Sequence, residues 1–202
     1  MRLCQYSGGI CLKRGYGIRW LRDWALPVII GVAVALGVRT WVVSANVVPS
    51  SSMYPTIPAT PTHHVYIVDD KLATEFGQPI HRGEVVVFHF PDNPKQLYVK
   101  RVIGLPGNTV KVTADAVYIN GKKLNESNPD IAKSNLPKLG TYHVPAGHYF
   151  MMGDNRTVSY DSRYWVHKYV ARSAIVGEAA FIMFPFENIG PISQSLSAPT
   201  GP

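Results

Sequence analysis

A run of mostly apolar residues, 24–43, constrains this chain more than any other feature of its sequence. The run is about as long as a helix must be to cross roughly 30 Å of hydrocarbon. Trp24 and Trp41 stand near its two ends, where the tryptophans of membrane helices gather. Arg39 lies about one turn from the end, so its long side chain can reach the headgroups. The pattern predicts one transmembrane helix over residues 24–43.

The positive charge of the chain is concentrated ahead of this run. The net charge is +7, and residues 1–23 hold five basic residues against one acidic residue. From residue 46 onward, 14 basic residues face 12 acidic ones, so a basic surface that binds nucleic acid is not expected. Positive charge before an apolar run marks the cytoplasmic end of a membrane helix. We therefore expect residues 1–23 in the cytoplasm and the body outside the cell membrane.

Two other interpretations of residues 24–43 stay open. Val43-Ser44-Ala45 has short residues at the −3 and −1 positions of a cleavable signal peptide. The run could also be a buried helix of the body, although a helix that is apolar on every face is unusual in a body this small. An uncleaved anchor is favoured because of the residues that follow it.

Short apolar alternations separated by turn residues follow the run, and they are typical of β-strands. These segments are residues 65–68, 85–88, 98–103, 110–112, 117–119, 148–152 and 174–184. Asn120-Gly121 predicts a hairpin turn that leads into residues 122–124. The sequence therefore predicts an all-β, mainly antiparallel body over residues 44–189.

Two stretches of the chain depart from this strand pattern. Residues 121–146 are more polar and rich in Asn, Lys and Pro, which predicts a small inserted β subdomain or flap. Residues 190–202 are rich in Ser and Pro without an apolar run, which predicts a disordered tail.

The common hydrolase motifs are missing from this sequence. It contains no G-x-S-x-G, no H-E-x-x-H and no paired C-x-x-C. His63 and His64 would point to opposite faces of a strand, so we predict no metal, and nothing indicates another cofactor. By composition, residues 49–56 resemble a Ser/Pro linker. Their position favours a catalytic role instead. At roughly 3.3 Å per residue Ser52 stays within about 30 Å of the membrane surface, so a nucleophile there could reach a substrate held in the bilayer.

Lys100 is the candidate base for a serine nucleophile. A serine hydroxyl attacks well only when a base takes its proton. A lysine can be that base only when it is neutral, so its pKa must fall by several units, and burial among apolar groups has this effect. Lys100 lies in the apolar stretch 97–103. A solvated lysine on an exposed strand face is far commoner, and the sequence alone does not decide between the two.

A third polar segment, residues 153–163, follows the predicted strand 148–152. One interpretation is a charged surface loop whose Asp161–Arg163 pair contributes little to stability. The other is a polar network that braces Lys100.

Taken together, these segments resemble the motif boxes of the type I signal peptidase family. The boxes are residues 49–56, 83–88 with Pro91, 98–107 and 153–163, in this order. The resemblance covers nearly the whole chain, including the basic N-terminus and the single span. It implies the family's all-β catalytic domain with a smaller inserted domain. It also implies a membrane-bound serine endopeptidase that removes signal peptides from exported proteins.

The resemblance implies the reacting groups. Ser52 would be the nucleophile and Lys100 the general base, and after acylation of Ser52 a water deprotonated by Lys100 would release the product. The Ser52 N–H and the Ser50 hydroxyl would form the oxyanion hole, in which losing one donor typically costs about a hundredfold or more in rate.

The resemblance also implies supporting roles in the last box. Ser159 would hydrogen-bond the amine of the lysine. Asp161 and Arg163 would hold the loop in position, and Asp154 and Asn155 would be structural. Substrates would carry small residues at −3 and −1 of the cleavage site, read by shallow apolar pockets. The residues expected to line these pockets are Val48, Met53, Ile57, Tyr98 and Val99.

Five positions depart from the pattern of the family. Ser51 stands where a Gly is usual, Glu84 and Asn108 where an Asp is usual, and Val166 where a Gly often follows the Trp. Asn46 replaces a commonly aromatic residue near the pocket. None of these changes removes a reacting group, but they leave the substrate preference open.

The partners implied are signal-peptide-bearing preproteins and the lipid bilayer. The sequence does not set the oligomeric state, and it is compatible with a monomer. Three alternatives stay open. One is another serine–lysine processing peptidase, such as a self-cleaving repressor or a conjugation-system enzyme. Another is an inactive membrane-anchored relative that acts as a binding or scaffold protein. The third is a secreted β-protein whose mature chain would begin at Asn46.

Overall fold

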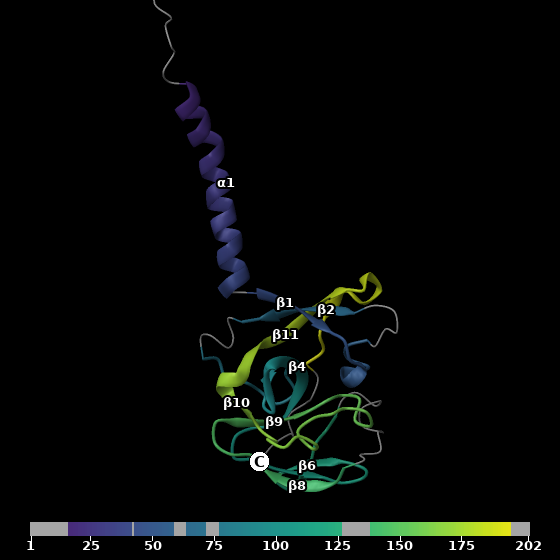
Figure 1. Ribbon diagram of the computed structural model, residues 1–202. Helices are drawn as coiled ribbons and strands as arrows, with labels where there is room; N and C mark the ends of the chain where they lie inside the picture. Colours follow the sequence, from purple (N-terminus) through teal and green to yellow (C-terminus); the bar gives the residue numbers. More distant parts are fainter. Residues whose placement is uncertain (1–15, 42, 59–63, 72–76, 127–137, 195–202) are drawn as a thin grey trace, which may run out of the picture. The chain divides into compact units, whose positions relative to one another are not determined.

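The computed structural model describes residues 16–41, 43–58, 64–71, 77–126 and 138–194. The chain divides into two compact units, Met1–Thr40 and Trp41–Pro202. Helix α1, Tyr16–Trp41, belongs to the first unit apart from its last residue, and every strand belongs to the second (Figure 1).

Helix α1 includes most of the predicted span but begins well before residue 24. Large apolar side chains along it are exposed, among them Trp24, Val28 and Ile29. Within the described part of the chain, no helix combines the length and the apolar character needed to cross a membrane. The transmembrane helix over residues 24–43 therefore stays a prediction.

The body is built on an eight-stranded antiparallel sheet. Its strands are paired in the order β1-β2-β11-β3-β4-β9-β10, with β12 on the free side of β11. Their bounds are β1 Val43–Val48, β2 Val65–Asp70, β3 Val85–Phe90, β4 Asn93–Gly104, β9 His148–Met152, β10 Val170–Ala171, β11 Ile175–Phe184 and β12 Gly190–Pro191.

The centre of this sheet is β3, which pairs with β11 on one side and β4 on the other. Residues 85–88 are a continuous apolar run and all are buried, as expected for a strand covered on both faces. The predicted strand segments 65–68, 85–88, 98–103, 148–152 and 174–184 all overlap strands of this sheet.

Strand β4 is exposed at its start and buried at its end. Its first five residues are exposed, whereas residues 100–104 are buried. Because side chains alternate between the faces of a strand, the neighbours Lys100 and Arg101 point to opposite sides. Strand β9 pairs with β4 so that Met152 lies opposite Arg101. The loop that begins at Gly153 therefore starts beside Lys100.

A second sheet has four strands in the order β7-β6-β5-β8. Their bounds are β5 Thr109–Val112, β6 Val117–Ile119, β7 Lys122–Lys123 and β8 Gly140–His143. The predicted subdomain 121–146 therefore began too late. The apolar alternation of β5 and β6 resembled that of the main body, and the polar sequence of β8 gave no sign that it pairs with β5. Residues 127–137 lie outside the described residues.

The buried faces of these strands form one apolar core with the main sheet. The cluster contains Ile103, Val110, Val112, Val117, Ile119, Leu124, Tyr142, Val144, Phe150 and Met152. It joins the four-stranded sheet to β4 and β9. The mainly antiparallel β-sheet body is thereby confirmed, and a separate four-stranded sheet lies between β4 and β9 in the chain.

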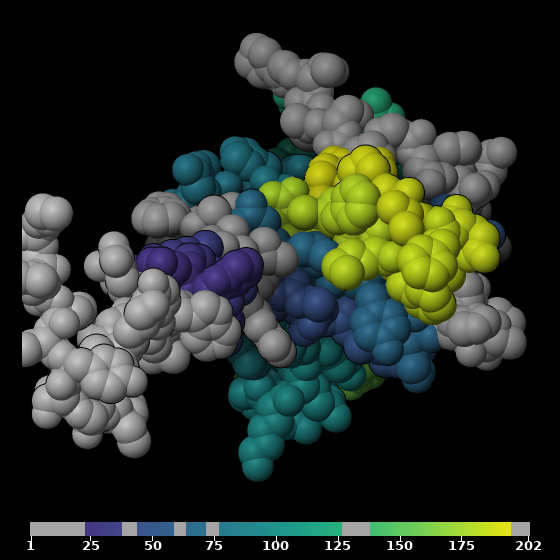
Figure 2. Space-filling model, turned by 90° about the horizontal axis from the view of Figure 1, so that it is seen from above, coloured from purple at the N-terminus to yellow at the C-terminus, as the bar shows by residue number. Residues whose placement is uncertain are grey.

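Residues 190–194 correct the prediction of a disordered tail that starts at residue 190. Strand β12 pairs with β11, and Ile192 is 4% exposed. The Gln194 side chain accepts a hydrogen bond from the Val85 N–H at 2.7 Å. Figure 2 shows the yellow-green residues of β11 and β12 next to the blue residues of β1 and β2. A two-residue strand has no alternation to detect, and residues 195–202 lie outside the described residues.

Candidate active site

Ser52 lies in the 3₁₀ turn η1, Ser51–Met53, which follows β1. The side chain is almost fully buried, at 8% exposed. Its Oγ is 3.0 Å from the Ser50 Oγ, within hydrogen-bond distance. The first N–H groups of a helical turn have no partner inside the turn, so the Ser52 N–H is free of intrahelical bonds. A hydroxyl and a backbone N–H donor are therefore close to the Ser52 Oγ.

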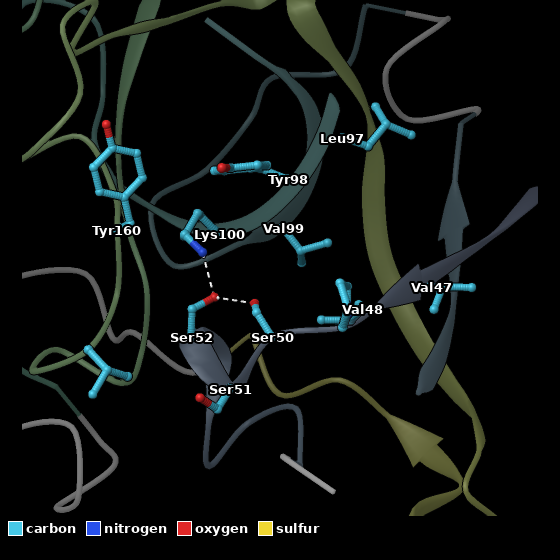
Figure 3. Close-up of a pocket in the computed structure, with 12 residues that line it drawn as sticks. Val47, Val48, Ser50, Ser51, Ser52, Leu97, Tyr98, Val99, Lys100 and Tyr160 are labelled. Carbon is cyan, nitrogen blue, oxygen red and sulfur yellow. Dashed lines mark hydrogen bonds between the residues drawn. The ribbon is translucent and has the colours of Figure 1, made fainter. Parts of the chain in front are cut away.

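Lys100 reaches the same point from β4. Its Nζ donates a hydrogen bond to the Ser52 Oγ at 2.5 Å, and Figure 3 shows the side chains of Ser50, Ser52 and Lys100 pointing toward one another. The lysine is 4% exposed. The Nζ also lies 5.6 Å from the centre of the Tyr98 ring. The two residues that the sequence predicts to react are thus in direct contact.

The surroundings of Lys100 favour its neutral form. Burial lowers the pKa of the amine from 10.5 to about 8, although the carboxylates of Asp161 and Asp154 act in the opposite direction. A neutral amine at this distance can accept the proton of the Ser52 hydroxyl, with the direction of the hydrogen bond reversed. The arrangement can therefore activate a serine for nucleophilic attack.

Arg101 and Asp154 form a buried ion pair behind Lys100. Arg101 donates from Nε to one carboxylate oxygen at 2.8 Å and from Nη2 to the other at 2.6 Å. Both side chains are about 1% exposed. Arg101 also donates to the Thr56 Oγ1 at 3.1 Å and to the Ser193 carbonyl at 3.0 Å. The pair links β4 to the chain after Ser52, to the loop after β9 and to the C-terminal segment.

Asp161 and Arg163 form a second pair within the loop 153–163. Arg163 donates from Nε at 2.8 Å and from Nη2 at 2.9 Å, one bond to each oxygen of Asp161. Asp161 also accepts a bond from the Gly153 N–H at 3.1 Å, which closes the loop on its first residue. Both side chains are fully buried. Of the two interpretations of this segment, the structure has the buried polar network.

The loop is also fastened to η1. The Asn155 N–H donates to the Ser52 carbonyl at 3.0 Å, and its side-chain amide donates to the Ser51 carbonyl at 3.3 Å. Gly153 allows this close approach, since a Cβ there would lie 2.5 Å from the Ser52 carbonyl oxygen and 2.2 Å from the Ser159 Oγ. Any side chain at Gly153 would push the loop away from Ser52.

Ser159 does not make the predicted hydrogen bond to the lysine amine. Its side chain is buried beside the dyad, yet its Oγ has no hydrogen-bond partner among the described residues. The hydroxyl lies against Gly153, while the amine of Lys100 is directed at Ser52.

A cavity of about 370 Å³ opens beside these groups. The side chains and backbone that line it belong to Val47, Val48, Pro49, Ser50, Ser51, Ser52, Leu97, Tyr98, Val99, Lys100, Val158 and Tyr160. Val48, Tyr98 and Val99, which are expected at the substrate pocket, line this cavity. Met53 and Ile57 do not line it; their side chains are fully buried in the core, at 0% and 1% exposed.

Comparisons with known proteins identify the family of this chain. The sequence profile of the family "Signal peptidase, peptidase S26" matches residues 21–184. The chain belongs to this family. A signal peptidase I from Bacillus amyloliquefaciens is 38% identical over 186 residues, which cover 88% of this chain and 92% of the relative. A signal peptidase I from Leptolyngbya laminosa is 38% identical over 172 residues, covering 80% of this chain and 78% of the relative.

Among solved structures, a signal peptidase I from Enterococcus faecalis matches at 34% identity with a TM-score of 0.43, covering 50% of this chain and 96% of that one. The resemblance predicted from the motif boxes is confirmed by the family profile and the relatives. Membership in the signal peptidase family makes the protein a serine peptidase, a hydrolase of peptide bonds.

Two of the departures from the usual pattern of signal peptidases have hydrogen-bond partners here, and a third is exposed. The Asn46 side chain donates to the carboxylate of Asp69 at 2.5 Å and does not line the cavity. The carbonyl oxygen of the Asn108 side chain accepts a bond from Arg82 at 2.8 Å. Val166 is 81% exposed, so the extra side chain at this position meets solvent.

Six residues that line the cavity were not among the predicted site residues: Val47, Pro49, Ser51, Leu97, Val158 and Tyr160. Val158 and Tyr160 flank Ser159 inside the last motif box. The signal available in the sequence was an apolar residue on each side of Ser159, because side chains separated by two positions in an extended segment lie on the same face.

Proposed function

We propose that this peptidase removes signal peptides from exported preproteins and cuts after small residues at the −3 and −1 positions. The observation that carries the proposal is the buried contact of 2.5 Å between the Lys100 Nζ and the Ser52 Oγ at the edge of an open cavity. Membership in the signal peptidase family supports the substrate class.

In the proposed reaction, Ser52 is the nucleophile and Lys100 the general base. Neutral Lys100 takes the hydroxyl proton as the Ser52 Oγ bonds to the carbonyl carbon of the substrate. The same proton passes from the lysine to the nitrogen of the leaving peptide as the C–N bond breaks, which leaves an ester on Ser52. Lys100 then deprotonates a water that attacks the ester, and the proton returns to the Ser52 Oγ when the signal peptide leaves.

The negative oxygen that forms in each step needs hydrogen-bond donors. The Ser52 N–H and the Ser50 hydroxyl are the proposed donors, and the 3.0 Å between the two serine oxygens supports the role of Ser50. Asp161, Arg163, Asp154 and Asn155 are proposed to hold the loop 153–163 and the strand of Lys100 in position rather than to react.

The preference for small residues rests on the wall formed by Val48 and Val99. In Figure 3 both side chains lie on the side of Ser52 that is away from Tyr160, and both line the cavity. Branched side chains that project into a cavity leave room for an Ala and obstruct larger side chains. This end of the cavity is therefore the proposed site for the residues that precede the cleaved bond.

Signal peptidases are membrane-associated, and for this chain we propose a single pass over residues 24–43, with residues 1–23 cytoplasmic and the body on the opposite side. The basic N-terminus and the apolar run support this topology. A second feature supports contact of the body with lipid. Phe181, Met183, Phe186 and Ile189 on β11 and in the segment after it are 38%, 48%, 74% and 50% exposed.

The test is cleavage of a peptide that carries an Ala-x-Ala site, with the full chain in detergent. Ser52→Ala and Lys100→Met should each lower kcat/KM by roughly 10⁴-fold or more, because they remove the two groups that act as a unit. The matched controls are Ser173→Ala and Lys123→Met, which change exposed residues of the same types.

Wild type and both controls should cut after the second Ala. Activity in Ser52→Ala equal to that of wild type would overturn the assignment of the nucleophile. A wild type that binds the peptide without cutting it would favour the alternative of an inactive membrane-anchored relative.

A further inference from the structure

The cavity continues past the Ser52–Lys100 contact in the direction away from Val48. Its lining on that side includes Val158 and Tyr160, both from the loop 153–163. In Figure 3 the Tyr160 ring lies across the Ser52–Lys100 pair from Val48 and Leu97. The reacting groups thus lie between two apolar walls, of which the proposed function uses only one.

Val158 and Tyr160 are unusual for a polar loop because they expose apolar surface beside the reacting groups. Val158 is 62% exposed and Tyr160 is 50% exposed. Their neighbours Ser159 and Asp161 are 2% and 0% exposed. The loop therefore turns its polar groups inward and two apolar side chains toward the cavity, the reverse of the usual arrangement.

The Tyr160 ring and the backbone of Val158 are held in position before any substrate binds. The Tyr160 ring lies edge-to-face with Phe90, at a centroid distance of 6.3 Å, and roughly parallel to Tyr164 at 6.2 Å. The Val158 N–H donates to the Asn155 carbonyl at 3.3 Å. A wall that is fixed in this way loses little conformational freedom when it binds a ligand.

A polypeptide that is cut at one bond must extend away from Ser52 in two directions. The proposed function assigns the residues before the bond to the wall of Val48 and Val99. The residues after the bond must then leave along the opposite wall. A partly exposed tyrosine ring and a valine favour apolar contacts and offer no charge to an acidic or basic side chain.

We propose that Val158 and Tyr160 form a binding subsite for the first two residues after the cleaved bond, with a preference for an apolar or aromatic side chain at one of them. The inference rests on the proposed function and adds a selectivity that the −3 and −1 positions do not supply. Because side chains of an extended chain alternate between two faces, one of these two positions faces the subsite and the other faces solvent.

The test uses the full chain in detergent and peptides with Ala at −3 and −1. One series varies the first residue after the bond among Gly, Leu, Phe and Asp, and a second series varies the next residue in the same way. For wild type we expect kcat/KM for Leu or Phe to exceed that for Gly by about threefold to tenfold in one series. Tyr160→Ser and Val158→Asn should bring this ratio close to one.

The controls separate a subsite from a general disturbance of the loop. Tyr160→Phe should keep the preference, because it keeps the ring. Tyr118→Ser and Val166→Asn change a tyrosine and a valine outside the cavity and should leave the ratio unchanged. The selectivity for Ala over Leu at −1 should stay the same in Tyr160→Ser, as expected if that position is read by the other wall.

The outcomes distinguish this inference from the proposed function. A wild type that cuts Ala-x-Ala peptides without any preference in either series would overturn the inference alone. A preference that persists in both Tyr160→Ser and Val158→Asn would overturn it as well. A wild type that cuts none of the peptides would overturn the proposed function and the inference together.

Discussion

The eight-stranded sheet and the four-stranded sheet differ in the side chains that they bury. Strands β5 to β8 bury no charged side chain among their described residues, and their inner faces form an ordinary apolar core. The eight-stranded sheet and the loop after β9 bury Asp69, Lys100, Arg101, Asp154, Asp161 and Arg163.

The difference in buried charge indicates a different structural role for each region. Burying a charge costs free energy unless hydrogen bonds and an opposite charge compensate it. An apolar core of the kind under β5 to β8 stabilises a sheet without that cost. The buried ion pairs beside Ser52 therefore point to a requirement for position, since each of them fixes the loop 153–163 or the strand that carries Lys100.

The largest effect on stability is expected from breaking the pair behind Lys100. Asp154→Ala leaves the Arg101 charge buried and should lower the free energy of unfolding by about 3–5 kcal/mol, with a loss of peptidase activity. The measurement is urea unfolding together with peptide cleavage, and Asp115→Ala, at an exposed aspartate, is the matched control.

The double variant Arg101→Met with Asp154→Leu separates the contribution of this ion pair to stability from its contribution to activity. Apolar side chains of similar size can replace a buried pair at little or no cost in stability. We expect stability to recover while activity stays low, because the bonds to Thr56 and Ser193 are lost. Recovery of both would mean that the pair serves stability alone.

The pH dependence of cleavage tests the environment of Lys100. With a pKa of about 8, the lysine is mostly protonated below that pH, and only the neutral form can accept the Ser52 proton. We expect kcat/KM to fall by about tenfold for each pH unit below the midpoint and to level off above it. A flat profile between pH 6 and 8 would contradict this assignment, and Lys123→Met should leave the profile unchanged.

A smaller effect is expected at the ion pair that connects the two regions. The Arg156 Nη2 lies 2.5 Å from the Glu126 Oε1, with side chains 1% and 8% exposed. Glu126→Gln keeps the shape and removes the charge, which should cost about 1–3 kcal/mol of stability. Thermal unfolding measures it, with the exposed Glu187→Gln as control. An unchanged melting temperature would mean that the two regions are stabilised independently.

The smallest effect should come from the apolar core of the four-stranded sheet. Ile119→Val removes one methylene from a fully apolar site and should cost about 1 kcal/mol of stability. Activity per folded molecule should not change. If kcat/KM fell together with stability, the separation between the core and the positioned polar region would be wrong.

The main strands could be predicted because their residues alternate or form continuous apolar runs. The run 85–88 predicted a buried strand, and β3 is the centre of the sheet. Strands β1, β10 and β12 escaped prediction, since they are short or follow directly on an apolar run and owe their existence to pairing with distant partners. The local sequence pattern does not reveal which distant strands will pair.

The site was predictable in its motif residues and less so in its geometry. The order of the motif boxes named Ser52 and Lys100, which lie in contact, although their roles stay a proposal. The boxes did not indicate that the Ser159 hydroxyl lies against Gly153. Nor did they indicate that Met53 and Ile57 fill the core behind the cavity. Both depend on the packing of side chains from several strands.

The contacts of the C-terminal segment set a limit on how this protein can be shortened. Ser193 and Gln194 supply bonds to Arg101 and to the backbone of Val85. The Ser/Pro-rich sequence suggests a truncation after Ile189. Such a truncation would remove the hydrogen bonds of Ser193 to Arg101 on β4 and of Gln194 to Val85 on β3. The strand that carries Lys100 would then be held less firmly. Purification tags and fusion partners therefore belong after residue 194, where they leave these bonds intact.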